Sequence, residues 1–241
     1  MVYERESITV AELKEILNTS ESTIRRDIIT LDKEGRLTKV FGGAIALHPA
    51  QIVNKELSMV QKQELQTTEK QAIARYAASL IEPDDCVYLD AGTTTGWMIE
   101  YIRQEKATYI TNALSHAKRL ADKGFSVILI GGEPKSSTDA IVGGEAVLNL
   151  QKYHFSKGFF GVNGVDRLSG FTTPDVKEAV VKQAAVKNTQ PAHRYFLTTS
   201  SKFGEVYAVT FAGFEGGTIL TEGNVSEALP KSIEIINVTQ Q

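Results

Sequence analysis

The sequence predicts two parts: a small helical segment with a β-hairpin, then a larger α/β domain. Two observations favour this division. In the first fifty residues, two short helical periods precede a pair of β-like segments around glycines. From residue 82 onward, short β-rich runs alternate with helical stretches, a pattern typical of a largely parallel sheet covered by helices. We expect the parts to span residues 1–48 and 67–241, joined by a linker over residues 49–66.

Composition limits the possible functions. The chain has 26 Lys and Arg against 29 Asp and Glu, a formal net charge of −3. A uniformly basic nucleic-acid binder is therefore excluded, and any such contact needs a local patch. The single cysteine, Cys86, excludes an intrachain disulfide and favours a reducing compartment. Without a long apolar segment or a signal-peptide pattern, we expect no membrane association and a cytoplasmic location.

The first helical period begins near Thr9. Val10, Leu13 and Leu17 recur at spacings of three and four, which predicts a short amphipathic helix. A polar stretch then interrupts the period. Within it, Ser20 is a good N-cap for a second helix that begins at residue 21.

The second helix has an apolar side and a polar side. Ile24, Ile28 and Leu31 fall on one stripe. Its other faces carry hydroxyls and cations, from Ser22, Thr23, Arg25, Arg26 and Lys33. Two short helices with a tight turn, the second exposing such side chains, resemble a helix-turn-helix that presents a recognition helix to the DNA major groove. For an isolated helix, a solvated face of any helical hairpin is the alternative.

A β-hairpin is predicted after the second helix. Gly35 is expected to end the helix, and RLTKVFGGAIAL supplies two β-like segments around a Gly42–Gly43 turn. This arrangement is typical of a wing. Residues 1–50 hold seven Lys and Arg against eight Asp and Glu, yet the charges after residue 34, on Arg36 and Lys39, are positive. A cationic face along DNA needs only this local segregation.

Residues 22–44, STIRRDIITLDKEGRLTKVFGGA, resemble the signature of the DeoR family of bacterial transcription regulators. The resemblance implies that double-stranded operator DNA is the partner of Ser22, Thr23, Arg25, Arg26, Lys33, Arg36 and Lys39. Family members usually have a further helix before the Thr9 region, and here Val2 and Tyr3 are expected to form its last turn. A sensor domain whose short N-terminus does not grip DNA is an alternative.

One strand of the α/β domain ends at a pattern suited to an anion. In YLDAGTTTGW a hydrophobic run ends at Asp90, a glycine turn follows, and Thr93, Thr94 and Thr95 begin a helix. Free N–H groups and hydroxyls at a helix N-terminus suit a phosphate. Alone the pattern is weak, because a glycine and a threonine cap open many helices that follow a strand.

Other strands also end in small or polar residues. Asn112, Gly131, Gly161 and Lys202 follow or end such runs, and ligands of parallel sheets bind outside the carboxyl ends of strands. We therefore expect a small polar ligand at this edge. Glu178 and Lys182, one turn apart on a predicted helix, either belong to the site or form a surface ion pair.

These motifs occur in the order of the DeoR-type sensor domain, and the resemblance covers roughly residues 9–223. It implies a fold similar to ribose-5-phosphate isomerase and a phosphorylated sugar as effector. The implied pocket comprises Asp90, Gly92, Thr93, Thr94, Thr95, Asn112, Glu178, Lys182 and Lys202. Its threonines and Lys202 are the expected phosphate partners.

The sequence departs from the family pattern at two places. Thr199 stands where the family often has Asp, and Lys62 or no residue matches an upstream Arg; either difference can change effector choice. The stretch GFTTPDVKEA resembles fructose-operon-type repressors, which suggests fructose 1-phosphate.

The resulting expectation is a cytoplasmic repressor of a sugar-utilisation operon, a homodimer or homotetramer, with no cofactor and no metal. The alternative is an enzyme similar to a sugar-phosphate isomerase. That alternative needs a general acid and a general base, and Asp90 and Glu178 are the candidates.

Overall fold

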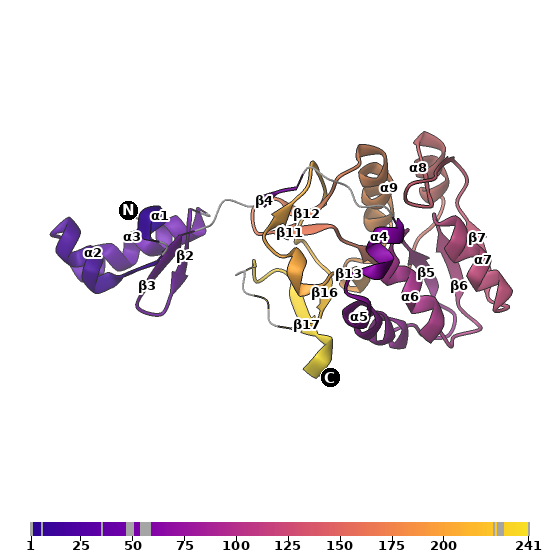
Figure 1. Cartoon of the computed structure of the whole chain (residues 1–241), viewed down its shortest axis with the longest axis horizontal. Helices are drawn as coiled ribbons and strands as arrows, with labels where there is room; N and C mark the ends of the chain where they lie inside the picture. Colours follow the sequence, from indigo (N-terminus) through magenta and orange to yellow (C-terminus); the bar gives the residue numbers. More distant parts are fainter. Residues whose placement is uncertain are drawn as a thin grey trace. The chain divides into compact units, whose positions relative to one another are not determined.

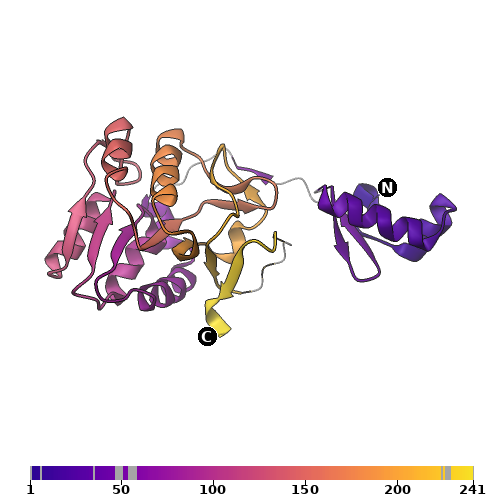
Figure 2. The ribbon, with the colours of Figure 1, turned by 180° about the vertical axis from the view of Figure 1, so that it is seen from behind.

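The computed structural model describes residues 2–5, 7–34, 36–46, 51–53, 59–223, 225 and 229–240. The chain divides into two compact units, Met1–Ala50 and Gln51–Gln241. Figures 1 and 2 show each unit from opposite sides.

The N-terminal unit combines short helices with a small antiparallel sheet. Its helices are α1 (Val2–Arg5), α2 (Val10–Leu17) and α3 (Glu21–Lys33), and its strands are β1 (Ser7–Thr9), β2 (Leu37–Val40) and β3 (Gly43–Ala46). The strands form a sheet in the order β1-β3-β2. Helix α1 stands where the sequence predicts the last turn of a preceding helix.

Local hydrogen bonds begin both longer helices. Thr9 and Glu12 form a reciprocal capping box at the start of α2, and the Ser20 side chain accepts a hydrogen bond from the backbone N–H of Thr23. Each cap satisfies an N–H group that the first turn leaves without an intrahelical partner. The prediction of Ser20 as the N-cap is thus confirmed.

A small apolar core holds this unit together. It comprises Ile8, Val10, Leu13, Ile24, Ile28, Leu37 and Ala44, with Val2 and Leu31 packed against it. Leu17 was expected on the apolar stripe of the first helix, but it is 51% exposed. It is the last residue of α2, and Asn18 then turns the chain in a left-handed conformation (φ 45°).

The wing differs from its prediction in two details. Val40 pairs with Gly43, so the turn is Phe41–Gly42 and not Gly42–Gly43. Gly42 has φ 82°, which glycine adopts without a steric penalty. Strand β1, which pairs with β3, was not predicted because three residues are too short for a β-period. Gly35, the predicted helix stop, lies outside the described residues.

The larger unit contains more elements. Its α-helices are α4 (Met59–Glu64), α5 (Thr67–Ser79), α6 (Thr93–Tyr101), α7 (Leu114–Asp122), α8 (Gly144–Leu150) and α9 (Val176–Lys187). The strands of its main sheet are β5 (Cys86–Leu89), β6 (Thr108–Thr111), β7 (Ser126–Leu129), β10 (Lys157–Gly161), β13 (Arg194–Leu197), β16 (Thr218–Thr221) and β17 (Glu234–Asn237). The remaining strands are β4 (Gln51–Ile52), β8 (Glu133–Lys135), β9 (Ala140–Val142), β11 (Gly164–Asp166), β12 (Gly170–Thr173), β14 (Glu205–Val206) and β15 (Val209–Ala212).

The main sheet is parallel and has seven strands in the order β17-β16-β13-β10-β5-β6-β7. The predicted α/β fold with a largely parallel sheet is therefore confirmed. From β5 the chain builds outward to β7, then returns to the other side of β5 with β10. The order of strands thus reverses between β5 and β10, and ligands of open parallel sheets bind at such a reversal.

Helices cover both faces of this sheet. Alternate residues of each strand point to opposite faces, so Tyr88 and Phe160 pack with α8 and α9, while Leu89 and Phe159 pack with α5, α6 and α7. Figure 1 shows the strands between these two layers of helices. Buried residues form both cores, and polar residues follow several of these strands at their carboxyl ends.

Small antiparallel sheets complete the unit. Strands β11, β12 and β15 form one, and β8 pairs with β9 in another. The sequence analysis did not predict them, because their glycines and polar residues resemble loops. The described residues also form 3₁₀ turns of three residues each: η1 (Pro191–His193), η2 (Ser200–Lys202) and η3 (Val238–Gln240).

Within the described part of the chain, no helix is long and apolar enough to span a bilayer.

The small N-terminal core predicts that substitutions of two neighbouring isoleucines of α3 affect stability very differently. Ile28 is 4% exposed and Ile29 is 38% exposed. We expect Ile28→Ala to lower the free energy of unfolding of this unit by about 2–5 kcal/mol, because it leaves a cavity. Ile29→Ala is the matched control. Hydrogen exchange of the α3 amides measures the difference, and equal protection in the two variants would contradict the assigned core.

Candidate functional site

The predicted DNA-binding side chains lie along one helix and the wing. Ser22, Arg25 and Arg26 of α3 are exposed, and so is Lys33 at its end, while Thr23 is half-buried. Arg36 and Lys39 are also exposed, before and within β2. The buried residues of α3, Ile24 and Ile28, point into the core instead.

The cations of this surface differ in their partners. Arg25 pairs with Glu21 at 2.6 Å, with both side chains more than half exposed, and Arg36 lies 3.6 Å from Glu34. Exposed pairs of this kind contribute about 0–1 kcal/mol, so either cation can exchange its partner for a phosphate. Arg26 makes no ion pair with the described residues.

A second set of predicted residues meets at the carboxyl ends of adjacent strands in the larger unit. Asp90 follows β5, Asn112 follows β6, Gly161 ends β10, and Lys202 lies in the 3₁₀ turn after β13. These strands are neighbours in the order β13-β10-β5-β6. The reversal of strand order between β5 and β10 therefore lies at the centre of the set.

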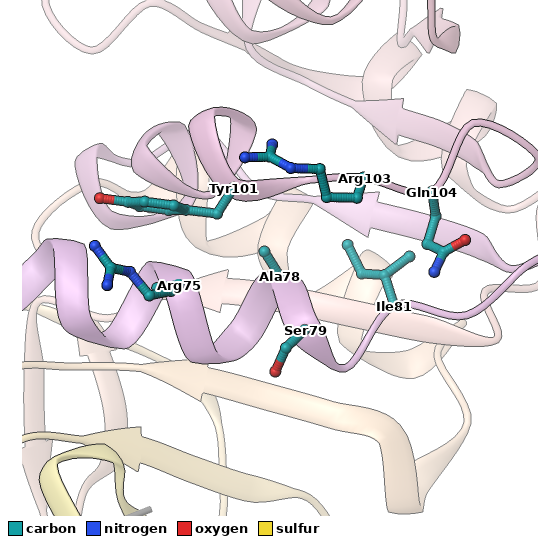
Figure 3. Close-up of a pocket in the computed structure, with 7 residues that line it drawn as sticks. All are labelled: Arg75, Ala78, Ser79, Ile81, Tyr101, Arg103 and Gln104. Atoms are coloured by element: carbon teal, nitrogen blue, oxygen red, sulfur yellow. The ribbon is translucent and has the colours of Figure 1, made fainter.

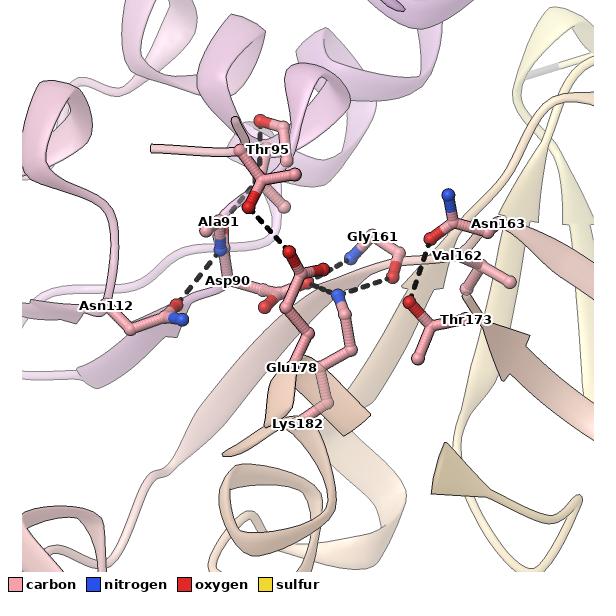
Figure 4. Close-up of polar contacts among 12 residues, drawn as sticks. Asp90, Ala91, Thr95, Asn112, Gly161, Val162, Asn163, Thr173, Glu178 and Lys182 are labelled. Carbon is pink, nitrogen blue, oxygen red and sulfur yellow. Dashed lines mark hydrogen bonds and ion pairs between the residues drawn. The ribbon is translucent and has the colours of Figure 1, made fainter. Parts of the chain in front are cut away.

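Asp90 ties three elements together at this point. Its Oδ2 accepts hydrogen bonds from the Lys182 ammonium group of α9 and from the Gly161 backbone N–H at 3.0 Å. Lys182 also donates to the Gly161 carbonyl at 3.0 Å. Asp90 and Lys182 are buried, with 1% and 4% exposed. Burial raises the pKa of Asp90, although Lys182 opposes the shift. Figure 4 shows these contacts.

The alternative of a surface pair between Glu178 and Lys182 is wrong. Both residues are buried, and their ion pairs are with other groups. Glu178 accepts hydrogen bonds from the Thr138 hydroxyl at 2.5 Å and from Lys135 at 3.0 Å. These contacts join the β8–β9 hairpin to the start of α9.

The start of α6 offers donors to a ligand. Its N-cap, Gly92, has no side-chain cap hydrogen bond, so the first N–H groups of the helix have no intrahelical or capping acceptor. Thr95 turns its hydroxyl inward and donates to the carbonyls of Asp90 (2.6 Å) and Gly92 (3.0 Å). Asn112 likewise supports the loop, because its Oδ1 accepts from Tyr88 and from the Ala91 N–H.

A small cavity opens beside this loop, and we call it the lysine cavity. Its volume is about 40 Å³. It is lined by Lys62, Ala91, Gly92, Thr93, Thr94, Thr138, Gly161, Val162, Asn163, Glu178, Lys182 and Lys202. Six of the nine predicted ligand residues line it. The other three, Asp90, Thr95 and Asn112, form hydrogen bonds with the backbone of the lining segments. The sequence analysis did not name Thr138 and Asn163. Thr138 lies in the turn of an unpredicted hairpin, and the one sequence signal for Asn163 is its place in GVNG (residues 161–164), at the end of an apolar run.

Cations dominate the electrostatics of the lysine cavity. Burial, together with the charges of Lys70 and Lys62, lowers the pKa of Lys202 to about 7. The Lys202 ammonium group donates to the Val162 carbonyl. Lys70, 3% exposed, donates to the carbonyls of Lys62 and Leu65 and so holds the end of α4 against this site. The cavity is thus suited to an anion.

A larger cavity of about 400 Å³ adjoins the same loop, and we call it the tryptophan cavity. It is lined by Gln63, Gly92, Thr93, Gly96, Trp97, Glu100, Ser115, His116 and Arg119. Burial and the nearby Arg119 lower the pKa of His116 to about 4, so its ring is neutral at pH 7.

Another cavity, of about 510 Å³, lies between α5 and the end of α6 (Figure 3) and contains no predicted ligand residue. Its two arginines are engaged in the fold. The Arg75 guanidinium lies 5.1 Å from the Tyr101 ring centroid, and Arg103 donates to the carbonyls of Glu100 and Ile102.

A helix-turn-helix with a wing, followed by an α/β domain with an anion-suited cavity at a strand reversal, defines a two-domain DNA-binding regulator. Residues 1–50 match the DeoR-like helix-turn-helix domain, and residues 65–222 match the DeoR C terminal sensor domain. The chain therefore belongs to the DeoR family. It is a DNA-binding transcription regulator of this family.

Curated relatives agree with this family. The chain is 44% identical over 215 residues to the uncharacterized HTH-type transcriptional regulator FruR of Bacillus subtilis (strain 168). The match covers 89% of this chain and 84% of that protein. It is 39% identical over 208 residues to the lactose phosphotransferase system repressor of Staphylococcus aureus (strain N315), covering 85% and 81%.

Among solved structures, the chain is similar to ribose 5 phosphate isomerase A from Neisseria gonorrhoeae, with a TM-score of 0.40 and 11% identity. The match covers 56% of this chain and 52% of that chain. This chain thus spans about half the length of the isomerase, and likeness at this level assigns no activity.

The buried pair of Asp90 and Lys182 predicts a large loss of stability when one partner is removed. We expect Lys182→Met to lower the free energy of unfolding by about 3–5 kcal/mol, because the Asp90 carboxylate is left buried without its cation. The double variant with Asp90→Asn should recover part of the loss. Lys177→Met on the same helix, which breaks an exposed pair with Glu133, should cost about 0–1 kcal/mol. Urea unfolding measures all four proteins, and similar losses in both single variants would contradict the assignment.

Proposed function

We propose that this protein represses a sugar-utilisation operon and that a phosphorylated sugar, bound in the larger unit, controls its affinity for operator DNA. The observation that carries the proposal is the lysine cavity. It brings the uncapped start of α6 together with three lysines, Lys62, Lys182 and Lys202. Helix N-termini and lysine ammonium groups are favourable partners for a phosphate.

The relatives support the sugar part of the proposal. One is named FruR and another is the repressor of a lactose phosphotransferase system. The stretch GFTTPDVKEA forms β12 and the start of α9, and its Glu178 lines the lysine cavity. We therefore propose fructose 1-phosphate as the first effector to test.

Control of DNA binding follows from a shift between arrangements of the protein. Recognition helices of a homodimer or homotetramer read half-sites at a fixed spacing. An effector that binds one arrangement better than another shifts the population toward it. A coupling of about 1–3 kcal/mol changes operator occupancy by roughly 5- to 150-fold. Such a repressor acts in the cytoplasm, where its operator lies.

Ligand identity is tested first. A panel of sugar phosphates, screened by thermal shift, should contain one that raises the melting temperature, because a ligand that binds the native state stabilises it. The same compound should change operator affinity in a gel shift. If no sugar phosphate changes either quantity, the proposed effector class is wrong.

The exposed cations of α3 predict a specific effect on DNA binding. Arg26→Ala should weaken operator affinity. If Arg26 neutralises one phosphate, the slope of log affinity against log salt concentration should become less steep by about 0.9. Binding of the sugar phosphate should not change. Lys152→Ala, which removes an exposed charge from the larger unit, is the control. Fluorescence anisotropy at several salt concentrations measures both slopes; operator affinity equal to that of the control would refute the proposed surface.

The pKa of Lys202, about 7, predicts a pH dependence of effector binding. A phosphate dianion favours the charged form of the Lys202 side chain. Above pH 7 this amine is mostly neutral, so it must take up a proton when the phosphate binds. Affinity should therefore be highest near or below pH 7 and fall above it, by up to about tenfold per pH unit for one proton. A phosphate monoester has a second pKa of about 6 and so stays dianionic above pH 7.

Lys202→Arg keeps its charge throughout this range and should flatten the profile. Calorimetric titrations between pH 7 and 9 measure it. A flat profile in the unmodified protein would contradict the role of Lys202.

A further inference from the structure

The lysine cavity is small for a whole sugar phosphate. Its volume is about 40 Å³, whereas pockets for small molecules typically measure about 300–1,000 Å³. A single ordered water needs at least roughly 10–15 Å³ of such space, so the lysine cavity suits a group of a few heavy atoms. The tryptophan cavity, at about 400 Å³, falls within the typical range.

The two cavities share a wall. Gly92 and Thr93 line both of them, and the consecutive residues Lys62 and Gln63 of α4 line one each. The two cavities therefore adjoin at the start of α6, and α4 contributes to the walls of both. A ligand with its anionic end at the lysines can extend past Thr93 into the larger space.

A buried nitrogen at the tryptophan cavity lacks a partner. His116 is 2% exposed and lines this cavity, and its Nδ1 has no hydrogen-bond partner within the described part of the chain. A hydrogen bond joins its ring to the Gly92 backbone. This contact favours a protonated ring nitrogen, so the ring donates in it, and Nδ1 of the neutral ring is an acceptor. An unpaired buried polar atom is costly, and a ligand hydroxyl that reached Nδ1 from the tryptophan cavity would remove this cost.

The other walls also suit a hydroxylated ring. Arg119 and Glu100 form a pair at 2.8 Å, with side chains 38% and 44% exposed, so both retain capacity for further hydrogen bonds. Trp97, half-buried, adds an aromatic surface. Small-molecule sites typically combine such an apolar wall with a few polar groups that set orientation.

We propose that a phosphorylated sugar binds across both cavities, with its phosphate in the lysine cavity and its hydroxylated ring in the tryptophan cavity. The inference rests on the proposed function and deepens it. It assigns the recognition of the sugar to Trp97, His116 and Arg119, and the recognition of the phosphate to Thr94 and the lysines.

The experiment compares two probes, inorganic phosphate and the sugar phosphate that gives the largest thermal shift, by calorimetric titration of the full chain. Arg119→Ala removes a polar wall, and Ser115→Phe adds bulk from an exposed position. Both should weaken binding of the sugar phosphate about tenfold or more and leave binding of phosphate unchanged. Thr94→Val should weaken both probes. Lys118→Ala, an exposed neighbour on α7, is the control.

Three outcomes separate the ideas. If both cavity variants bind the sugar phosphate as tightly as the control does, the sugar is not in the tryptophan cavity and the inference is wrong, while the proposed function stands. If Arg119→Ala weakens both probes equally, the division of the ligand between cavities is wrong. If the unmodified protein binds no sugar phosphate, the proposed function fails, and the inference fails with it. Melting curves of each variant establish that it is folded.

Discussion

The site depends on the buried contact between Asp90 and Lys182. It joins the end of β5, the end of β10 and helix α9 at the one place where the order of strands reverses. The two strand ends are also joined by backbone hydrogen bonds, such as that from the Asp90 N–H to the Phe159 carbonyl at 3.1 Å, whereas the Asp90–Lys182 pair adds a polar link from these ends to α9. The contact therefore sets the position of the α6 start relative to Gly161 and Lys182, and with it the shape of the lysine cavity.

The same contact explains which polar groups remain for a ligand. Asp90 is engaged by Lys182 and by the Gly161 N–H, and Glu178 is engaged by Lys135 and Thr138. Both acids are thus neutralised within the fold. The two acids that isomerase chemistry would need are therefore held as structural partners, which agrees with the proposed regulator controlled by a bound ligand.

Much of this arrangement could be predicted from the sequence, for physical reasons. Parallel strands are apolar along their whole length because both faces of the sheet are covered. The residues after each apolar run could therefore be placed at the edge formed by the carboxyl ends of the strands. The orientation of each side chain could not, because it depends on neighbours distant in sequence. Thr95 and Asn112 bind backbone groups of the loop, and Thr138 reaches the cavity from a hairpin whose short strands carry no clear period.

Helix α4 has a consequence for how such regulators diversify. It comes after the DNA-binding unit in the chain, and its Lys62 and Gln63 line the two cavities, while Lys70 anchors its last carbonyls. A substitution at Lys62 or Gln63 would therefore change the wall of the lysine cavity or of the tryptophan cavity, so that one short helix could alter ligand preference among related regulators.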